Sequence, residues 1–352
     1  MVPNAGRRPA IGLGIMAVLS GGSLMSQPAQ PGMQSIGSQG HRPNTAVVTN
    51  YHGWTQAILI SNGRVEALVV PEAGRVMQFR FAGSANGPFW ENTKLYGTTS
   101  SPTNWNTPGA IGGDKSWPAP QSDWPRHSPW SPPFGFDGNP CACGITNGAV
   151  TLTGVVDADY QIRVARTVEL DPEQAAMRIK TVFQRVNSTS WTNKPVSVWV
   201  ITQVQDAVGF YVPVPAQSIF PGANYFQLGR GLPARFQNTN GLISFTRDLA
   251  AERHLGFDAN SLAWVGTNWA MRIDAPRVAG LSQTNYPNGG CNTVIYTNPG
   301  TDAPYVELEC FGPLRILPAG QTMEFVTTYT LFHRTDANPE VEARKVLGLP
   351  AR

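Results

Sequence analysis

The chain has 352 residues, of which only 14% are charged, and it contains 36 glycines, 30 prolines and 10 tryptophans. Its net charge is +3 and the basic residues are scattered, which argues against a nucleic-acid-binding surface and against a charge-rich helical fold. Low charge combined with many turn-forming residues predicts an all-β protein, and the length suffices for a large hydrophobic core.

The N-terminus has the layout of an export signal. Arg7 and Arg8 precede a short apolar run from Ala10 to Met25, and small and polar residues follow. The run is too short and too rich in glycine for stable membrane insertion. We expect an export signal over residues 1–29, a disordered leader over 30–46, and a mature protein that is periplasmic or secreted. The paired arginines leave both the general and the twin-arginine routes open, and a disordered tail is the alternative.

Short runs rich in Val, Ile, Phe and Thr recur from residue 51 onward between turn signals, and several of them alternate in polarity. More than a dozen such runs without a helical half predict one large β-sandwich over residues 47–336. We expect a short helix around Pro339–Leu347 within the tail 337–352. The predicted strands are Gln56–Ser61, Val65–Val70, Arg75–Ala82, Ala149–Val156, Tyr160–Leu170, Ala176–Val186, Val196–Gln205, Gly241–Arg247, Ser261–Thr267, Ala270–Asp274, Thr293–Tyr296, Tyr305–Cys310 and Glu324–His333.

The stretch from Gly112 to Trp130 places three tryptophans among four prolines, together with several polar side chains. The proline spacing predicts a stiff, irregular loop, because each proline removes a backbone donor and restricts the residue before it. Indole faces beside polar groups suit a sugar, which stacks through its C–H face and bonds through its hydroxyls. The alternative is a lid whose tryptophans only close one end of the sandwich.

Cys291 and Cys310 flank a predicted hairpin whose turn lies at Asn298–Asp302. A turn centred between residues 300 and 301 would place the two cysteines opposite each other, close enough for a disulfide in an oxidising compartment. The same register would put Glu307 opposite Val294 and Glu309 opposite Asn292.

The order of several segments resembles the galactose-mutarotase-like (aldose 1-epimerase-like) superfamily over roughly residues 51–333. The segments that carry the resemblance are Asn62–Val76, Phe89–Asn92, Gly112–Gln121, Tyr305–Glu309 and Leu317–Gln321. The resemblance implies an all-β supersandwich of large antiparallel sheets with a sugar cleft on its concave face. The partner would then be a sugar or oligosaccharide, with no cofactor and no metal.

Mutarotation needs a base at the anomeric hydroxyl and an acid at the ring oxygen. The resemblance places Glu307 where the family has its base, with Glu309 on the same strand face because side chains alternate along a strand. The sugar-binding residues that we expect are Arg75, Asn92, Asp114, Lys115, Trp117, Gln121, Trp124, Trp199, Gln203 and Glu309.

The acid is where the chain departs from the family. Trp199 stands roughly where the family's histidine would lie, and tryptophan cannot supply a proton. His127 in the proline-rich stretch is the first substitute and His254 the second. Two functions therefore remain open, an aldose-epimerase-like enzyme and a carbohydrate-binding protein without catalysis. Glycoside hydrolysis is a weaker alternative, because Glu307 and Glu309 share one strand face and Asp114 or Asp123 would have to join them.

Overall fold

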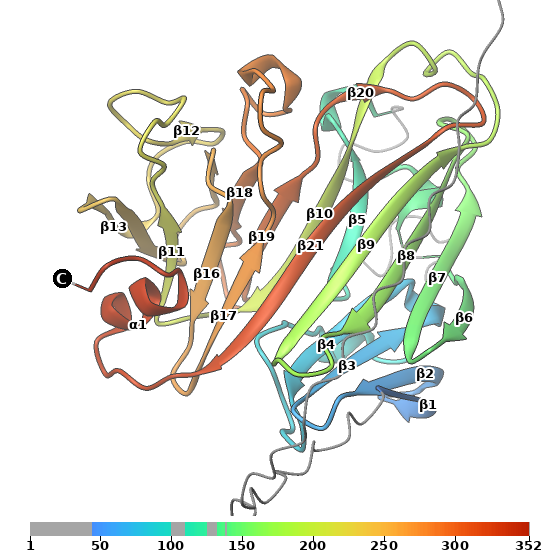
Figure 1. The fold of residues 1–352 in the computed structure, drawn as a ribbon, viewed down its shortest axis with the longest axis horizontal. Coiled ribbons are helices and arrows are strands. Elements are labelled where there is room, and N and C mark those ends of the chain that lie inside the picture. Colours follow the sequence, from blue (N-terminus) through green and yellow to red (C-terminus); the bar gives the residue numbers. More distant parts are fainter. Residues whose placement is uncertain (1–43, 100–109, 125–131, 138, 352) are drawn as a thin grey trace, which may run out of the picture. The chain divides into compact units, whose positions relative to one another are not determined.

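The computed structural model describes residues 44–99, 110–124, 132–137 and 139–351, which form two large antiparallel sheets (Figure 1). The all-β prediction is confirmed. The predicted export signal and all but the last three residues of the predicted leader lie outside the described residues, and the first strand already begins at Thr45. Within the described part of the chain, no helix is long and apolar enough to cross a membrane.

The first sheet has 11 strands in the order β1-β2-β3-β4-β5-β10-β19-β18-β15-β12, with β20 paired to β10. Its strands are β1 (Thr45–Tyr51), β2 (Trp54–Ser61), β3 (Val65–Val70), β4 (Arg75–Phe81), β5 (Asp114–Ala119), β10 (Pro195–Gln205), β12 (Phe226–Gln227), β15 (Arg253–Phe257), β18 (Thr293–Thr297), β19 (Tyr305–Phe311) and β20 (Arg315–Ile316).

The second sheet has ten strands in the order β13-β14-β11-β16-β17-β21-β9-β8-β7-β6, and its longest strand, β21, runs beside β9 and β17 (Figure 1). Its strands are β6 (Ala142–Thr146), β7 (Ala149–Val156), β8 (Ile162–Leu170), β9 (Ala176–Arg185), β11 (Gly209–Pro213), β13 (Ala234–Thr239), β14 (Leu242–Thr246), β16 (Ser261–Val265), β17 (Trp269–Asp274) and β21 (Thr322–His333). Short 3-10 helices lie at Pro71–Ala73, Thr93–Leu95, Gln121–Asp123, Phe134–Phe136 and Gln283–Asn285.

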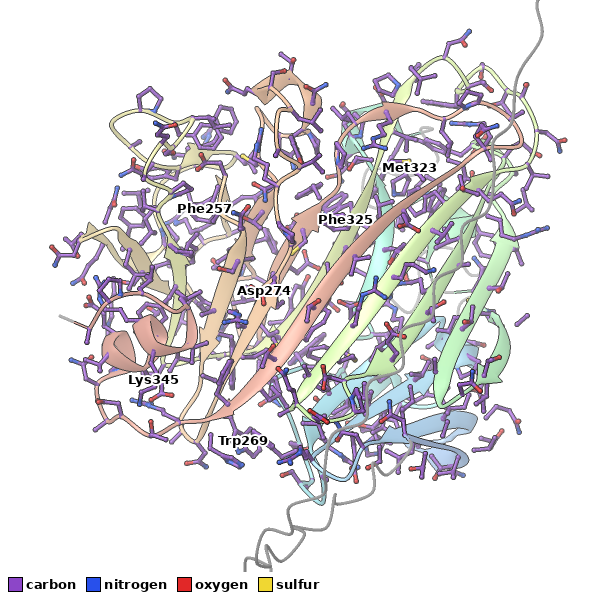
Figure 2. The ribbon with its side chains drawn as sticks, viewed as in Figure 1. Phe257, Trp269, Asp274, Met323, Phe325 and Lys345 are labelled. Carbon is purple, nitrogen blue, oxygen red and sulfur yellow. The ribbon has the colours of Figure 1, made fainter. Side chains whose placement is uncertain are left out.

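The main core lies between the two sheets, because alternate residues of both point into it. Met323 and Phe325 are two of the residues that β21 contributes (Figure 2). Phe257 and Leu308 come from the first sheet, and Phe183 from the second. Each such side chain contributes about 1.5–3 kcal/mol through burial. The alternation that places these residues in the core turns the next residues of the central strands toward the opposite face of the first sheet.

Strand β5 corrects the prediction that the whole proline-rich stretch is irregular. Residues 114–119 pair with β10 along their whole length, but with β4 only through Asp114 opposite Val76. Beyond Asp114 one side of β5 has no strand partner, so Pro118 removes no ladder hydrogen bond there. The strand therefore tolerates a proline and carries Lys115 and Trp117 into the sheet.

The predicted register of β18 and β19 is wrong by two residues. Thr293, and not Cys291, lies opposite Cys310, while Glu309 lies opposite Val294 and Glu307 opposite Tyr296. The connection spans residues 298–304, which moves the pivot one residue toward the C-terminus. A shift of two leaves both glutamates on the predicted face.

The same register explains why Cys291 and Cys310 are free thiols in the structure. Cys310 points into the core between the sheets, whereas Cys291 belongs to a separate apolar cluster with Trp199 and Phe311 and packs against Gly256. The two thiols lie on opposite faces of one sheet, so the predicted cross-strand pairing does not form.

The C-terminal helix α1 (Pro339–Val346) forms where the sequence predicts it. Asn338 caps its N-terminus by accepting a hydrogen bond from the Glu340 amide at 2.9 Å, and Pro339 occupies the first turn. Ala343 and Val346 pack on apolar residues of the second sheet, which holds the helix there.

Candidate functional site

The polar residues of the predicted site gather on one face of the first sheet, the face of β5, β10, β19, β18 and β15 that points away from the main core. We call it the site face. Its side chains form rows, because directly paired residues on neighbouring antiparallel strands lie about 5 Å apart. One row contains His254, Tyr296, Glu307 and Gln203.

Two further rows run parallel to the first. The middle row contains Gly256, Val294, Glu309, Ile201 and Lys115. The third row is aromatic and contains Phe311, Trp199 and Trp117. Strands far apart in the sequence thus place two carboxylates, a lysine and a histidine beside a set of aromatic rings.

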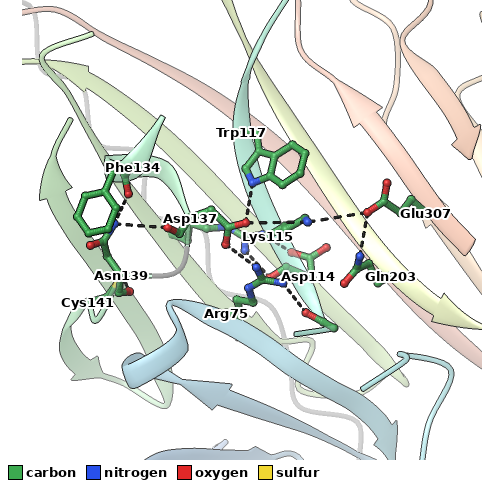
Figure 3. Close-up of polar contacts among 12 residues, drawn as sticks. Arg75, Asp114, Lys115, Trp117, Phe134, Asp137, Asn139, Cys141, Gln203 and Glu307 are labelled. Atoms are coloured by element: carbon green, nitrogen blue, oxygen red, sulfur yellow. Dashed lines mark hydrogen bonds and ion pairs between the residues drawn. The ribbon is translucent and has the colours of Figure 1, made fainter. Parts of the chain in front are cut away.

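Glu307 lies near the centre of the site face and is 12% exposed. One carboxylate oxygen accepts a hydrogen bond from Gln203 Nε2 at 2.9 Å and lies 3.8 Å from Lys115 Nζ (Figure 3). Burial raises the pKa of Glu307, the charge of Lys115 opposes that rise, and Glu309 adds to it. The result is a carboxyl group with a pKa above its ordinary value, which is a property of general bases that work near neutral pH.

Lys115 connects Glu307 to a second charged group, Asp137, whose nearer oxygen lies 3.9 Å from Lys115 Nζ (Figure 3). Asp137 also accepts a hydrogen bond from Arg75 at 2.6 Å and one from the Trp117 indole at 2.8 Å. Burial alone would raise the pKa of Asp137, but Arg75, Lys115 and Trp117 together hold it below its ordinary value. Burial lowers the pKa of Lys115, and its two carboxylate partners oppose that shift.

Glu309 and His254 form a second acid–base pair, which is an ion pair when His254 is protonated. Glu309 is 1% exposed, and one of its oxygens lies 3.4 Å from His254 Nε2. The contact lacks hydrogen-bond alignment, so the buried His254 Nε2 has no hydrogen-bond partner. The other Glu309 oxygen is also buried without a partner. Burial alone would lower the pKa of His254, but Glu309, Glu307 and Glu252 raise it above the ordinary value.

The aromatic row borders these charges. Trp117 and Trp199 meet edge to face with ring centroids 5.3 Å apart, and Phe311 stacks on Trp199 at 5.2 Å. Trp124 packs against Trp117 at 5.4 Å and donates its indole hydrogen to the Pro118 carbonyl at 2.8 Å. The Trp199 indole nitrogen is buried and has no hydrogen-bond partner. Buried donors are normally bonded, so this indole is an exception on the site face.

Comparison with known structures identifies the fold. The chain superimposes with a TM-score of 0.50 and 13% identity on a protein of Escherichia coli K12 provisionally assigned as an aldose 1-epimerase, covering 78% of this chain and 98% of that one. It superimposes equally well, with a TM-score of 0.50 and 10% identity, on a galactose mutarotase related enzyme from Lactobacillus acidophilus, covering 80% and 98%. The chain has the galactose-mutarotase-like fold. No protein-family model and no curated protein sequence matches it.

In this mutarotase-like fold, most of the predicted site residues share the site face. Lys115, Trp117, Trp124, Trp199, Gln203, Glu307 and Glu309 belong to the rows or pack on them, and Arg75 joins them through Asp137. Gln121 is exposed on the 3-10 helix that follows β5. His127 lies outside the described residues.

Two predicted residues do not join this cluster. Asp114 points into the core between the sheets, where it contacts Arg166, Thr202 and Tyr329. Its neighbour Lys115 takes the site face, since successive residues of a strand point to opposite sides. Asn92 caps the 3-10 helix Thr93–Leu95 and donates a hydrogen bond to the Ala110 carbonyl.

Asp137 was missed by the sequence analysis, and no local signal identifies it. It lies in a loop 62 residues from its partner Arg75, so only the fold brings them together. His254 ranked behind His127 because its strand was not predicted. The five residues of β15, Arg253–Phe257, include a glycine and no β-branched residue, so the composition of the segment does not indicate a strand. Within the described residues, no group of three His, Cys, Asp or Glu side chains is arranged to hold a metal ion.

Proposed function

We propose that this protein binds a sugar on the site face and interconverts its anomers with Glu307 as the base. The observation that carries the proposal is the Glu307 carboxylate, which Gln203 and Lys115 hold at hydrogen-bond and ion-pair distance beside a row of aromatic rings. A sugar needs both parts of this surface, because its ring stacks on aromatic faces while its hydroxyls need polar partners.

The chemistry follows from the position of the carboxylate. Glu307 takes the proton of the anomeric hydroxyl while an acid protonates the ring oxygen, and the bond between the anomeric carbon and the ring oxygen breaks. The carbonyl carbon that forms rotates and the ring closes on its other face, with both protons returned. Lys115 favours the ionised form of Glu307 and so counteracts the burial of the base.

The buried polar atoms without partners support a ligand with hydroxyl groups. Gln203 Oε1 and one oxygen of Glu309 are free acceptors, and the Trp199 indole is a free donor. A hydroxyl both donates and accepts, so a single class of ligand group serves all three. Lys115 is shared by Asp137 and Glu307, which favours a neutral sugar over an anionic one.

A second candidate function is sugar binding without catalysis. Trp199 favours it, because this residue stands where the family resemblance places the acid, and it extends the aromatic surface instead. Trp117→Ala and Trp124→Ala would then weaken binding to a sugar panel, while Glu307→Gln would leave the affinity unchanged.

Polarimetry on freshly dissolved α-aldoses separates the two functions. We expect relaxation of the optical rotation above the uncatalysed rate for at least one sugar, lost in Glu307→Gln and kept in Glu324→Gln, which alters an exposed glutamate on β21. Uncatalysed relaxation across a broad panel would refute the enzymatic proposal. Retained binding of one of those sugars would then support the second candidate.

We also propose export to the periplasm or the medium, on the composition of residues 1–29. Mass spectrometry of the protein from its native host should find a mature N-terminus near residues 26–37. An intact N-terminus in the cytoplasm would contradict this proposal.

A further inference from the structure

The proposed function leaves the proton donor unassigned, although several side chains of the site face carry N–H or O–H groups. The Gln203 amide and the Trp199 indole do not release a proton in the working pH range. Burial raises the pKa of Tyr296, so its hydroxyl keeps its proton, and Lys115 and His254 remain. The choice therefore lies between the lysine and the histidine.

Lys115 is already committed to other partners. Its ammonium lies between Asp137 and Glu307, at 3.9 and 3.8 Å, and 3.9 Å from the ring centroid of Trp117. Only 5% of the side chain is exposed. Loss of its proton would leave both carboxylates without their shared cation, so Lys115 serves to hold the base ionised.

His254 has the opposite character. Its side chain is 31% exposed although the Nε2 atom itself is buried, and Nε2 lies 3.4 Å from a Glu309 oxygen without making an aligned hydrogen bond. Nε2 is therefore a donor without a partner, and Glu309 lies close enough to stabilise the imidazolium. The second Glu309 oxygen is a buried acceptor without a partner beside it.

The register of the sheet places this donor suitably. His254 and Glu307 belong to one row and are separated by a single residue, Tyr296. Two strand spacings put their backbones about 10 Å apart on the same face of the sheet. Tyr296 directs its hydroxyl toward Glu252 and Asn298, and its ring meets the His254 ring edge to face with centroids 5.6 Å apart.

We propose that His254, held by Glu309, is the proton donor to the ring oxygen of the bound sugar. This inference rests on the proposed function and moves the acid from β10, where the family resemblance places it, to β15. Glu307 would take the anomeric proton on one side of the sugar and His254 would deliver a proton on the other, with the two protons exchanged back on ring closure.

The pH dependence follows from the titratable groups that face His254. They are Glu252, which directly precedes β15, Tyr296 from β18, and Glu307 and Glu309 from β19. The acid must be protonated, so activity falls as the pH rises through the pKa of His254. The base must be ionised, so activity also falls as the pH drops through the pKa of Glu307. We expect a bell-shaped profile whose alkaline limb belongs to His254.

The experiment combines polarimetry with nitrogen-15 NMR of the histidine side chains. His254→Gln should slow mutarotation by about 10²–10⁴-fold, with KM changed far less than kcat, and should remove the alkaline limb. Glu309→Gln should shift that limb and the NMR titration of His254 to lower pH. His333→Gln, which alters an exposed histidine stacked on Phe81, is the control and should behave as wild type.

Failure of the donor and failure of the proposed function are distinguishable. A folded His254→Gln variant that keeps the wild-type rate and alkaline limb, while Glu307→Gln is inactive, would overturn the donor and leave the function intact. A His254 titration that Glu309→Gln does not move would also overturn it. Uncatalysed relaxation with the wild-type protein would refute the proposed function before any variant is made.

Discussion

Asp114 and Lys115 are neighbours on β5, yet they belong to two polar regions of opposite character. Asp114 points between the sheets, where one carboxylate oxygen bonds Arg166 and the other bonds Thr202 and Tyr329. Arg166 also donates to the Asp114 carbonyl at 2.9 Å. Lys115 points to the site face, where Gln203, Glu309, Trp199 and His254 each keep a buried atom without a hydrogen-bond partner.

The difference separates a structural network from the proposed ligand site. The interior network joins β5 and β10 to β8 and β21, so it ties the two sheets together through bonds that are all made within the protein. On the site face, several polar atoms are desolvated but unbonded, which costs stability. Buried polar atoms without partners call for an explanation such as a bound ligand or an ordered water, and the predictions below test the first of these.

The largest expected effect comes from the interior. Asp114→Ala removes the partner of a buried arginine and should reduce the free energy of unfolding by about 3–5 kcal/mol. Glu169→Gln is the matched control, because it breaks the Glu169–Arg178 pair at 2.7 Å, in which both side chains are more than 40% exposed. It should cost less than about 1 kcal/mol. Urea denaturation measures both, and equal effects would contradict the structural role of Asp114.

One substitution applied to two neighbours of the aromatic row sharpens the comparison. Trp117→Phe removes a hydrogen bond to the buried Asp137 and should cost about 1–3 kcal/mol of stability beyond the lost packing. Trp199→Phe removes a donor that has no partner, so its cost should be smaller. Denaturant titration of both variants decides this, and a larger loss at Trp199 would mean that its indole is bonded within the protein.

Trp199→Phe should affect sugar affinity even though its expected effect on stability is small. If its indole donates to the sugar, Trp199→Phe should weaken the affinity about fivefold, the equivalent of about 1 kcal/mol. Isothermal titration with a sugar identified by polarimetry would measure the change. An unchanged affinity would remove Trp199 from the ligand contacts.

Glu307→Gln should stabilise the protein at alkaline pH. The folded-state pKa of Glu307 is raised, so the native state loses stability as the pH rises from the unfolded pKa through the folded one. The neutral amide lacks this loss, and the variant should exceed wild type at pH 8 by more than at pH 4. Thermal denaturation at the two pH values tests it, with Glu324→Gln as the control for an exposed glutamate. A variant less stable than wild type at pH 8 would show that Lys115 outweighs burial.

No effect is expected from reductant. Cys291 and Cys310 lie on opposite faces of the sheet, so the melting temperature should be the same with and without it. Non-reducing peptide mapping should recover both cysteines as alkylated thiols. A linked Cys291–Cys310 peptide would contradict the register of β18 and β19.

Much of the framework followed from the sequence alone, because it depends on local periodicity. Alternation along β8 and β21 identified strands and their buried faces, and it placed Glu307 and Glu309 on one side of β19. The helix at Pro339 had its own cap and proline signals. These features need only the chemistry of neighbouring residues, so they are legible before the chain folds.

The tertiary structure alone decided which strands align and which side chains meet. The loop between β18 and β19 set a register two residues from the predicted one, and the missing strand on one side of β5 made room for Pro118. Asp137 met Lys115 from a loop, and His254 met Glu309 across β18. Such contacts join residues that are distant in sequence, so their geometry depends on how the strands are ordered and aligned in the sheet, which no local pattern encodes.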